Sequence, residues 1–171
     1  MNTIVGLTGA IGSGKSTLAK FLVAWRFKVL DVDELAATAA KEAGYEPRAA
    51  LEKVLAGDKA LEAQLAAVVI ARVKAWVAAT RGLKLIDAAL LFEHGLDSLC
   101  TVTVCLTCPR EVRQARVTRR KTASAGLFEV IERTQWAEAG KASKANHVVD
   151  ANRELDVVAA DVVRVLGVPA P

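Results

Sequence analysis

Short apolar runs alternate with longer segments of helical periodicity along this chain of 171 residues. The runs that predict buried strands are residues 4–7, 27–32, 83–87, 101–106 and 147–149. The segments that predict helices are residues 16–24, 34–80 with two breaks, 109–121, 127–139 and 153–166. The first strand, helix and second strand describe a βαβ crossover, which requires a parallel sheet. The pattern therefore predicts an α/β fold with a central parallel sheet.

A glycine-rich motif lies between the first apolar run and the first helical segment. Residues 9–16, GAIGSGKS, have the P-loop form G-x-x-x-x-G-K-[ST]. In such a loop the backbone N–H groups and the start of the following helix bind a polyphosphate. Lys15 can reach the β- and γ-phosphates, and the Ser16 hydroxyl can ligate Mg²⁺. We therefore expect ATP and Mg²⁺ as ligands, with the nucleotide held by Gly9, Ala10, Ile11, Gly12, Ser13, Gly14, Lys15, Ser16 and Thr17.

The segment 34–80 interrupts the alternation of strands and helices because it contains no strand-like run. Breaks are expected near Pro47 and near the pair Gly57-Asp58. The apolar residues of 60–80 recur at helical spacing, which predicts one long amphipathic helix that ends before Gly82. We expect this block, about 34–81, to form a helical cap on the acceptor side of a single domain that covers residues 1–171.

Asp87 ends the strand-like run 83–87. Parallel sheets place their ligand crevice at the carboxyl ends of the strands. A carboxylate beside a P-loop can hold Mg²⁺, directly or through water, and the alternative is that Asp87 caps the turn that follows.

The most basic part of the chain is residues 113–121, which contain Arg113, Arg116, Arg119, Arg120 and Lys121. One explanation is a solvated helix face. The other is a short lid, at about residues 116–134, whose arginines close on ATP and neutralise the transferred phosphoryl group.

Composition places the chain among globular proteins, with 53% hydrophobic and 25% charged residues. No signal-peptide pattern is seen, and the apolar run 65–71 is too short to span a bilayer, so we expect a cytoplasmic protein without a membrane partner. The formal net charge of +4 suits an anionic ligand. Because no basic stripe with interleaved aromatic residues is present, we do not expect nucleic-acid binding.

The three cysteines lie close together in the sequence, and Cys105 and Cys108 form a C-x-x-C motif. A structural zinc site normally has four ligands, and no second Cys/His pair occurs at a suitable spacing. We expect reduced cysteines that pack as small apolar residues, with metal or disulfide chemistry as the alternative. Neither His94 nor His147 lies in a ligand or catalytic-triad pattern.

Taken in order, these segments resemble the dephospho-coenzyme A kinases, a family of P-loop small-molecule kinases. Residues 4–17 are similar to the opening strand and loop of the family, and 29–36, VLDVDELA, resemble its D-x-D segment. Residues 87–93, DAALLFE, resemble its D-x-P-L-L-F-E stretch. Residues 108–114, followed by Arg116, Arg120 and Gln135, are similar to its lid region.

The resemblance implies a three-layer P-loop kinase fold and transfer of the ATP γ-phosphoryl group to the ribose 3′-hydroxyl of dephospho-CoA. The second aspartate of the D-x-D segment is the catalytic base in that family, and this role falls on Asp33. Lys15, Arg116 and Arg120 would stabilise the phosphoryl charge. Contacts with the acceptor would fall on Asp31, Asp33, Arg48, Leu91 and Glu93.

Three alternatives stay open. Asp33 alone could be the N-cap of a helix that begins near Glu34. The acceptor could be a nucleoside, a sugar or a shikimate-like alcohol. The helical block is shorter than the family pattern, so the chain could also bind a nucleotide without transferring a phosphoryl group.

Overall fold

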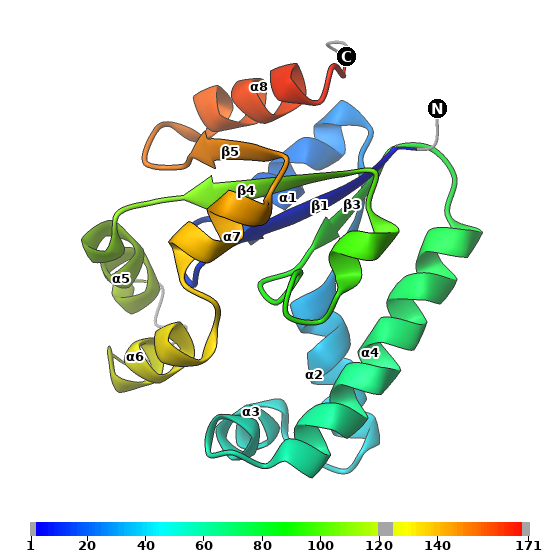
Figure 1. The fold of residues 1–171 in the computed structure, drawn as a ribbon, viewed down its shortest axis with the longest axis vertical. Coiled ribbons are helices and arrows are strands. Elements are labelled where there is room, and N and C mark those ends of the chain that lie inside the picture. Colours follow the sequence, from blue (N-terminus) through cyan, green and yellow to red (C-terminus); the bar gives the residue numbers. More distant parts are fainter. Residues whose placement is uncertain (1–2, 120–124, 169–171) are drawn as a thin grey trace.

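A parallel sheet forms the centre of the molecule (Figure 1). The computed structural model describes residues 3–119 and 125–168. The strands are β1 (Ile4–Gly9), β2 (Lys28–Asp31), β3 (Lys84–Asp87), β4 (Val102–Thr107) and β5 (His147–Asp150). They lie in the order β2-β3-β1-β4-β5, and every neighbouring pair is parallel. The prediction of a central parallel sheet is confirmed.

Helices cover both faces of this sheet, which gives three layers (Figure 1). One face packs against α1 (Lys15–Leu22) and α8 (Leu155–Val165). The other packs against α4 (Lys59–Ala79), the short helix η2 (Leu96–Leu99) and α7 (Glu138–Lys144). Consecutive residues of β3 show the division, because Leu85 belongs to the first core and Ile86 to the second. Burial on both faces explains why the strands are continuous apolar runs in the sequence.

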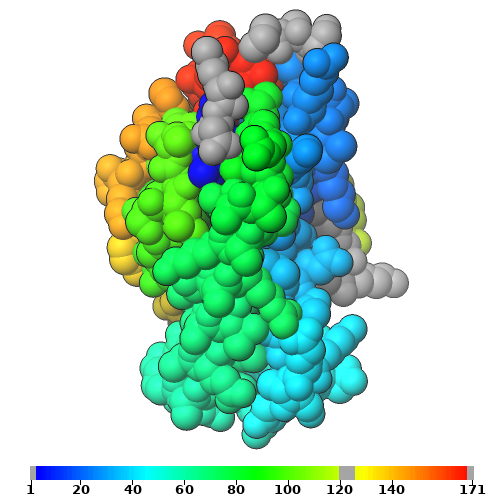
Figure 2. Space-filling model, turned by 90° about the vertical axis from the view of Figure 1, so that its right-hand side faces the viewer, coloured from blue at the N-terminus to red at the C-terminus, as the bar shows by residue number. Residues whose placement is uncertain are grey.

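The helices α2 (Val32–Glu42), α3 (Pro47–Leu55) and α4 form the helical insert. Figures 1 and 2 show that α3 and the beginning of α4 project beyond the sheet. The predicted long helix is confirmed, but its apolar residues are not confined to one face, so the expected amphipathic character is wrong. The Asp58 carboxylate caps its start by accepting a hydrogen bond from the backbone N–H of Leu61 at 3.0 Å. Ala40, Ala50 and Leu61 give the insert a small core of its own.

The segment after β4 forms α5 (Arg110–Arg119) and, beyond residues 120–124, α6 (Ala125–Thr134). The predicted continuous helix over residues 127–139 is wrong, because α6 ends at Thr134 and α7 begins at Glu138. Tertiary contacts explain the break: the Trp136 N–H donates to Glu93 at 2.9 Å, and the Glu138 carboxylate accepts from the Cys108 N–H at 3.1 Å. The first helix also differs from its prediction, since it ends at Leu22 and a short helix, η1 (Val23–Trp25), follows.

Across residues 3–119 and 125–168, no helix combines the length and the apolar character that crossing a membrane would need.

Candidate functional site

The P-loop connects the end of β1 to the start of α1, as its motif predicts. The loop turns back on itself, with the Ser13 N–H donating to the Ala10 carbonyl at 3.1 Å. Gly12 has a φ of +79°, and a Cβ atom there would lie 2.5 Å from the carbonyl oxygen of Arg113. Because an L-residue resists both the positive φ and this contact, only glycine fits the position. The helix α1 begins at Lys15, directly after this loop, and a helix start beside a glycine-rich loop is the arrangement that binds phosphate.

Lys15 is the buried cation of this loop, with only 7% of its surface exposed. No carboxylate in the described part of the chain forms an ion pair with it. A buried ammonium group without a counter-ion costs free energy, and a polyphosphate would supply the missing negative charge. Lys15 still acts at a distance, because its charge opposes the rise in pKa that burial causes at Asp33 and at Asp87.

Three aspartates lie at the carboxyl ends of the strands beside the P-loop. Asp87 is the register partner of Asp31 on β2 and of Leu7 on β1. The Asp31 carboxylate accepts from the Glu34 N–H at 3.0 Å and is the N-cap of α2. The alternative that Asp33 caps this helix is therefore wrong. Asp33 lies in the first turn of α2, where it is exposed to solvent.

Asp87, at the end of β3, is a buried carboxylate. Burial raises its pKa to about 6, Lys15 and the nearby Ser16 hydroxyl lower it, and Asp33 and Asp31 raise it further. Both of its oxygens are buried without a hydrogen-bond partner in the described residues, so its proximity to Ser16 does not amount to a hydrogen bond of ordinary geometry.

This pair of unpartnered oxygens beside a hydroxyl fits Mg²⁺, which prefers oxygen ligands. In the described part of the chain no group of three His, Cys, Asp or Glu side chains is arranged to hold a metal ion. A Mg²⁺ ion at Ser16 and Asp87 would accordingly take its other ligands from phosphate oxygens and water, as is usual for this ion.

Asp33 is open to solvent, yet the surrounding protein atoms desolvate its carboxylate, and this raises its pKa. Lys15 opposes the increase, Asp31 adds to it, and Lys141 and His94 oppose it more weakly. A carboxylate that a substrate can reach and whose proton affinity is raised is suited to accept a proton.

Two arginines of the basic stretch turn inward from α5 and contact the P-loop. Arg116 donates to the Ser13 carbonyl at 3.3 Å and to the Ala151 carbonyl at 2.9 Å. Arg113 is buried and donates to the Ile11 carbonyl at 3.1 Å. The explanation of a solvated helix face is thus wrong for these two side chains, whereas Arg120 lies outside the described residues.

The other residues predicted to contact the acceptor have different environments. Glu93 is ion-paired with Lys141 at 2.9 Å, and its second oxygen is buried without a partner in the described residues. Leu91 is fully buried in the apolar core, so its side chain offers no surface to an acceptor, which corrects the prediction. Arg48 is exposed on α3 and pairs with Glu52 four residues later.

Sequence reasoning missed Lys141, which lies on α7, is completely buried and also donates to the Ala89 carbonyl. Its helix is short and polar, so nothing in the local pattern distinguishes it from an exposed lysine. Arg113 was visible as part of a basic stretch, but a charge pattern does not reveal which arginine turns inward.

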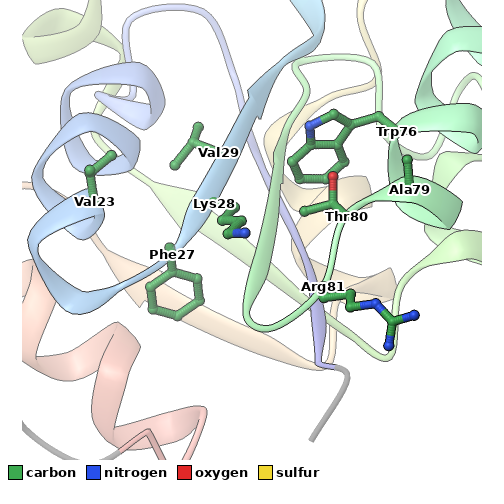
Figure 3. Close-up of a pocket in the computed structure, with 8 residues that line it drawn as sticks. All are labelled: Val23, Phe27, Lys28, Val29, Trp76, Ala79, Thr80 and Arg81. Atoms are coloured by element: carbon green, nitrogen blue, oxygen red, sulfur yellow. The ribbon is translucent and has the colours of Figure 1, made fainter.

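The molecule has a cavity beside the P-loop and a wider groove away from the predicted site residues. A cavity of about 280 Å³ lies beside the P-loop, between Ala10, Arg113 and the segment Gln135–Glu138. A wider groove of about 620 Å³ lies where η1, the start of β2 and the end of α4 meet, with Phe27, Lys28 and Trp76 in its wall (Figure 3). None of the predicted site residues lines the groove, so we place the chemistry at the P-loop.

The sheet, its two helical layers and the P-loop after β1 define the chain as a protein of the P-loop kinase fold. The structure of shikimate kinase from Aquifex aeolicus shares this fold, with a TM-score of 0.65 at 19% identity over 96% of each chain. The crystal structure of TT1252 from Thermus thermophilus is more similar, with a TM-score of 0.82 at 30% identity over 99% of this chain and 98% of that one.

The family model of the dephospho-CoA kinases matches residues 3–56 and 41–156, and the chain belongs to this family. A dephospho-CoA kinase of Thermus thermophilus is 31% identical over 90% of this chain and 85% of the relative. One of Agrobacterium fabrum is 30% identical over 97% of both chains.

Replacing Gly12 by alanine should weaken nucleotide binding, because the added Cβ would meet the Arg113 carbonyl oxygen at 2.5 Å and displace the loop. Titration with ATP should show an affinity at least roughly tenfold weaker, which corresponds to a loss of about 1.4 kcal/mol. Gly44→Ala is the matched control, since Gly44 has a φ of +85° with nothing within 4 Å of its Cβ position. It should cost about 1–2 kcal/mol of stability and leave ATP affinity unchanged. Unaltered affinity in Gly12→Ala would contradict this account of the loop.

Replacing Asp87 by asparagine should stabilise the ligand-free protein at pH 8. The folded protein favours the protonated carboxyl, so ionisation of Asp87 costs stability above its pKa of about 6 and costs none below the ordinary value of 3.8. Urea unfolding without Mg²⁺ should show a gain of up to about 3 kcal/mol at pH 8, and the gain should shrink as the pH falls toward 4. The variant should also lose the increase in ATP affinity that Mg²⁺ gives. An equal effect at both pH values would exclude this electrostatic origin.

Proposed function

We propose that this protein transfers the γ-phosphoryl group of ATP to the ribose 3′-hydroxyl of dephospho-CoA, which gives CoA and ADP in the last step of coenzyme A biosynthesis. Membership of the dephospho-CoA kinase family supports the reaction and its substrates. The observation that carries the proposal is that a buried cation and an exposed carboxylate lie near each other without forming an ion pair. Lys15, which has no counter-ion in the described residues, and Asp33, which a substrate can reach, interact electrostatically at one edge of the sheet.

In this proposal the P-loop binds the phosphates of ATP through its backbone N–H groups, and Lys15 neutralises charge on the β- and γ-phosphates. Asp33 accepts the proton of the acceptor hydroxyl while the hydroxyl oxygen forms a bond to the γ-phosphorus of ATP. The bond between the γ-phosphorus and the oxygen that links it to the β-phosphate breaks, and ADP leaves with that electron pair. The protein supplies position and charge rather than a covalent intermediate.

Ser16 and Asp87 are the residues that would hold Mg²⁺. When bound, the ion neutralises phosphate charge and orients the phosphate chain. Asp87 would then be ionised, because a cation beside it lowers the pKa that burial has raised.

The acceptor enters, in this proposal, between the P-loop and the helical insert, because Asp33 belongs to the first turn of α2. Asp31 fixes that turn as its N-cap, and we assign it this positioning role in place of a direct contact. We also infer that the reaction takes place in the cytoplasm, in line with the three cysteines, which are free thiols.

Purified protein with ATP and Mg²⁺ should release ADP at a substantial rate only after dephospho-CoA is added. A coupled assay for ADP measures this, and mass spectrometry of the product should show CoA. Shikimate, a nucleoside and a sugar serve as control acceptors and should give no more than the basal rate. Turnover with one of these instead would assign a different kinase reaction, and ATP binding without turnover on any acceptor would leave a nucleotide-binding protein.

Replacing Asp33 by asparagine should lower kcat by about 10²- to 10⁴-fold, the usual contribution of a general base. The affinity for ATP should stay nearly the same, because Asp33 is not part of the P-loop. Glu34→Gln is the matched control: it removes the same charge from the next residue, which is exposed, and should retain nearly full activity. If Asp33→Asn turned over as fast as the wild type, Asp33 would not be the base.

A further inference from the structure

Arg113 has an unusual environment for a charged side chain, because arginines are rarely buried unless they are paired. Its side chain is only 6% exposed, and its guanidinium group joins four segments. The Nη1 atom donates to the Ile11 carbonyl of the P-loop at 3.1 Å, and Nε donates to the Cys108 carbonyl, just after β4, at 3.0 Å. The Nη2 atom donates to Glu132 of α6 at 2.5 Å. Glu138, at the start of α7, lies 3.7 Å from Nε.

The contact with Ile11 supports the P-loop from behind. When the N–H groups of a phosphate-binding loop point at the ligand, its carbonyl groups point away and need donors of their own. Arg113 supplies a donor to the Ile11 carbonyl, and the Arg113 backbone lies against Gly12. One residue of α5 therefore contacts the loop through both its side chain and its main chain.

A buried guanidinium group keeps its charge and needs a fixed counter-charge. Glu132 provides it from α6, since Arg113 and Arg110 hold the pKa of Glu132 below its usual value although burial works in the opposite direction. The position of the Arg113 side chain, and with it the support of the Ile11 carbonyl, thus depends on α6 being packed against α5.

A cavity lies between the P-loop and the end of α6, so Arg113 connects two segments that are otherwise separated there. The cavity of about 280 Å³ separates Ala10 from Gln135, and Arg113 and Glu132 form part of its wall. Arg113 donates a hydrogen bond both to the loop, at Ile11, and to α6, at Glu132.

We propose that Arg113 is a positioning residue that couples the packing of α6 to the conformation of the P-loop, so that the loop binds nucleotide tightly only while Glu132 holds Arg113 in place. The inference rests on the proposed function for its biological meaning. Its test does not, because nucleotide affinity is measured without an acceptor.

Arg110 provides a matched control on the same helix. It also pairs with Glu132, at 2.7 Å, and with Glu129, but its side chain is 43% exposed, and its hydrogen bonds within the described residues go to α5 and α6. Arg110→Gln removes an equal charge and also removes an α5–α6 ion pair with Glu132. It leaves Arg113 in place as the donor to the Ile11 carbonyl.

The experiment measures the affinity for a non-hydrolysable ATP analogue by calorimetry in Arg113→Gln, Glu132→Gln, Arg110→Gln and the double variant of Arg113 and Glu132. Arg113→Gln should weaken binding by about tenfold or more, and Glu132→Gln should weaken it by about threefold to tenfold, in the range of coupled contacts. In the double variant Glu132→Gln should add nothing, because its effect passes through Arg113. Arg110→Gln should stay within about twofold of the wild type.

Steady-state kinetics give a second readout if the first experiment shows the expected loss. A positioning role predicts that the KM for ATP rises while kcat at saturating ATP falls much less. Arg113→Lys, which keeps the charge but not the fork of donors, should recover part of the affinity. If Arg113→Gln does not fold, the comparison of Glu132→Gln with Arg110→Gln decides alone: equal affinities in those two variants overturn the coupling, as does full affinity in Arg113→Gln or an additive effect in the double variant.

Discussion

The structure depends on one electrostatic constraint, the burial of the Lys15 ammonium group without a counter-ion in the described residues. Two carboxylates lie close enough to interact with it, but burial raises the pKa of Asp33 and of Asp87 and so disfavours their charged forms. In the ligand-free site a fixed positive charge thus lies near two carboxyl groups whose ionised forms burial makes less favourable. In the proposed function a polyphosphate with its metal ion would resolve both problems, since the phosphates would bring negative charge to Lys15 and the metal ion would bring positive charge to Asp87.

The parallel sheet makes this constraint possible. Register places Asp31, Asp87 and Leu7 side by side on three neighbouring strands, and such strands lie about 4.8 Å apart. Residues separated by some eighty positions in the chain therefore meet at one edge. The cores on both faces fix the strands that carry them, so the geometry of the site follows from apolar packing far from any charged group.

Sequence predicted the elements whose signals are local: the apolar runs, the long helix of the insert, and a P-loop confined to eight residues. The break between α6 and α7 escaped prediction because no glycine or proline marks it, and the contacts of Trp136 and Glu138 that produce it come from distant segments. Lys141 was missed for the same reason, since its burial depends on a carbonyl and a carboxylate from a distant segment that accept hydrogen bonds from its ammonium group. For Leu91, packing turns the side chain into the core, and a motif match does not reveal the direction of a side chain.

The buried polar atoms without partners follow a pattern that supports this view of the molecule. Within the described residues they belong to Ser13, Asp87, Glu93, His94 and Gln135. Each lies in the P-loop, in or just after β3, or just after α6, and none lies in the helices that cover the first face of the sheet. An unsatisfied buried polar group costs about 1–3 kcal/mol, and folded proteins retain few of them. The free protein gives up stability at these groups, and a ligand that supplies hydrogen bonds and charge to them gains that free energy on binding.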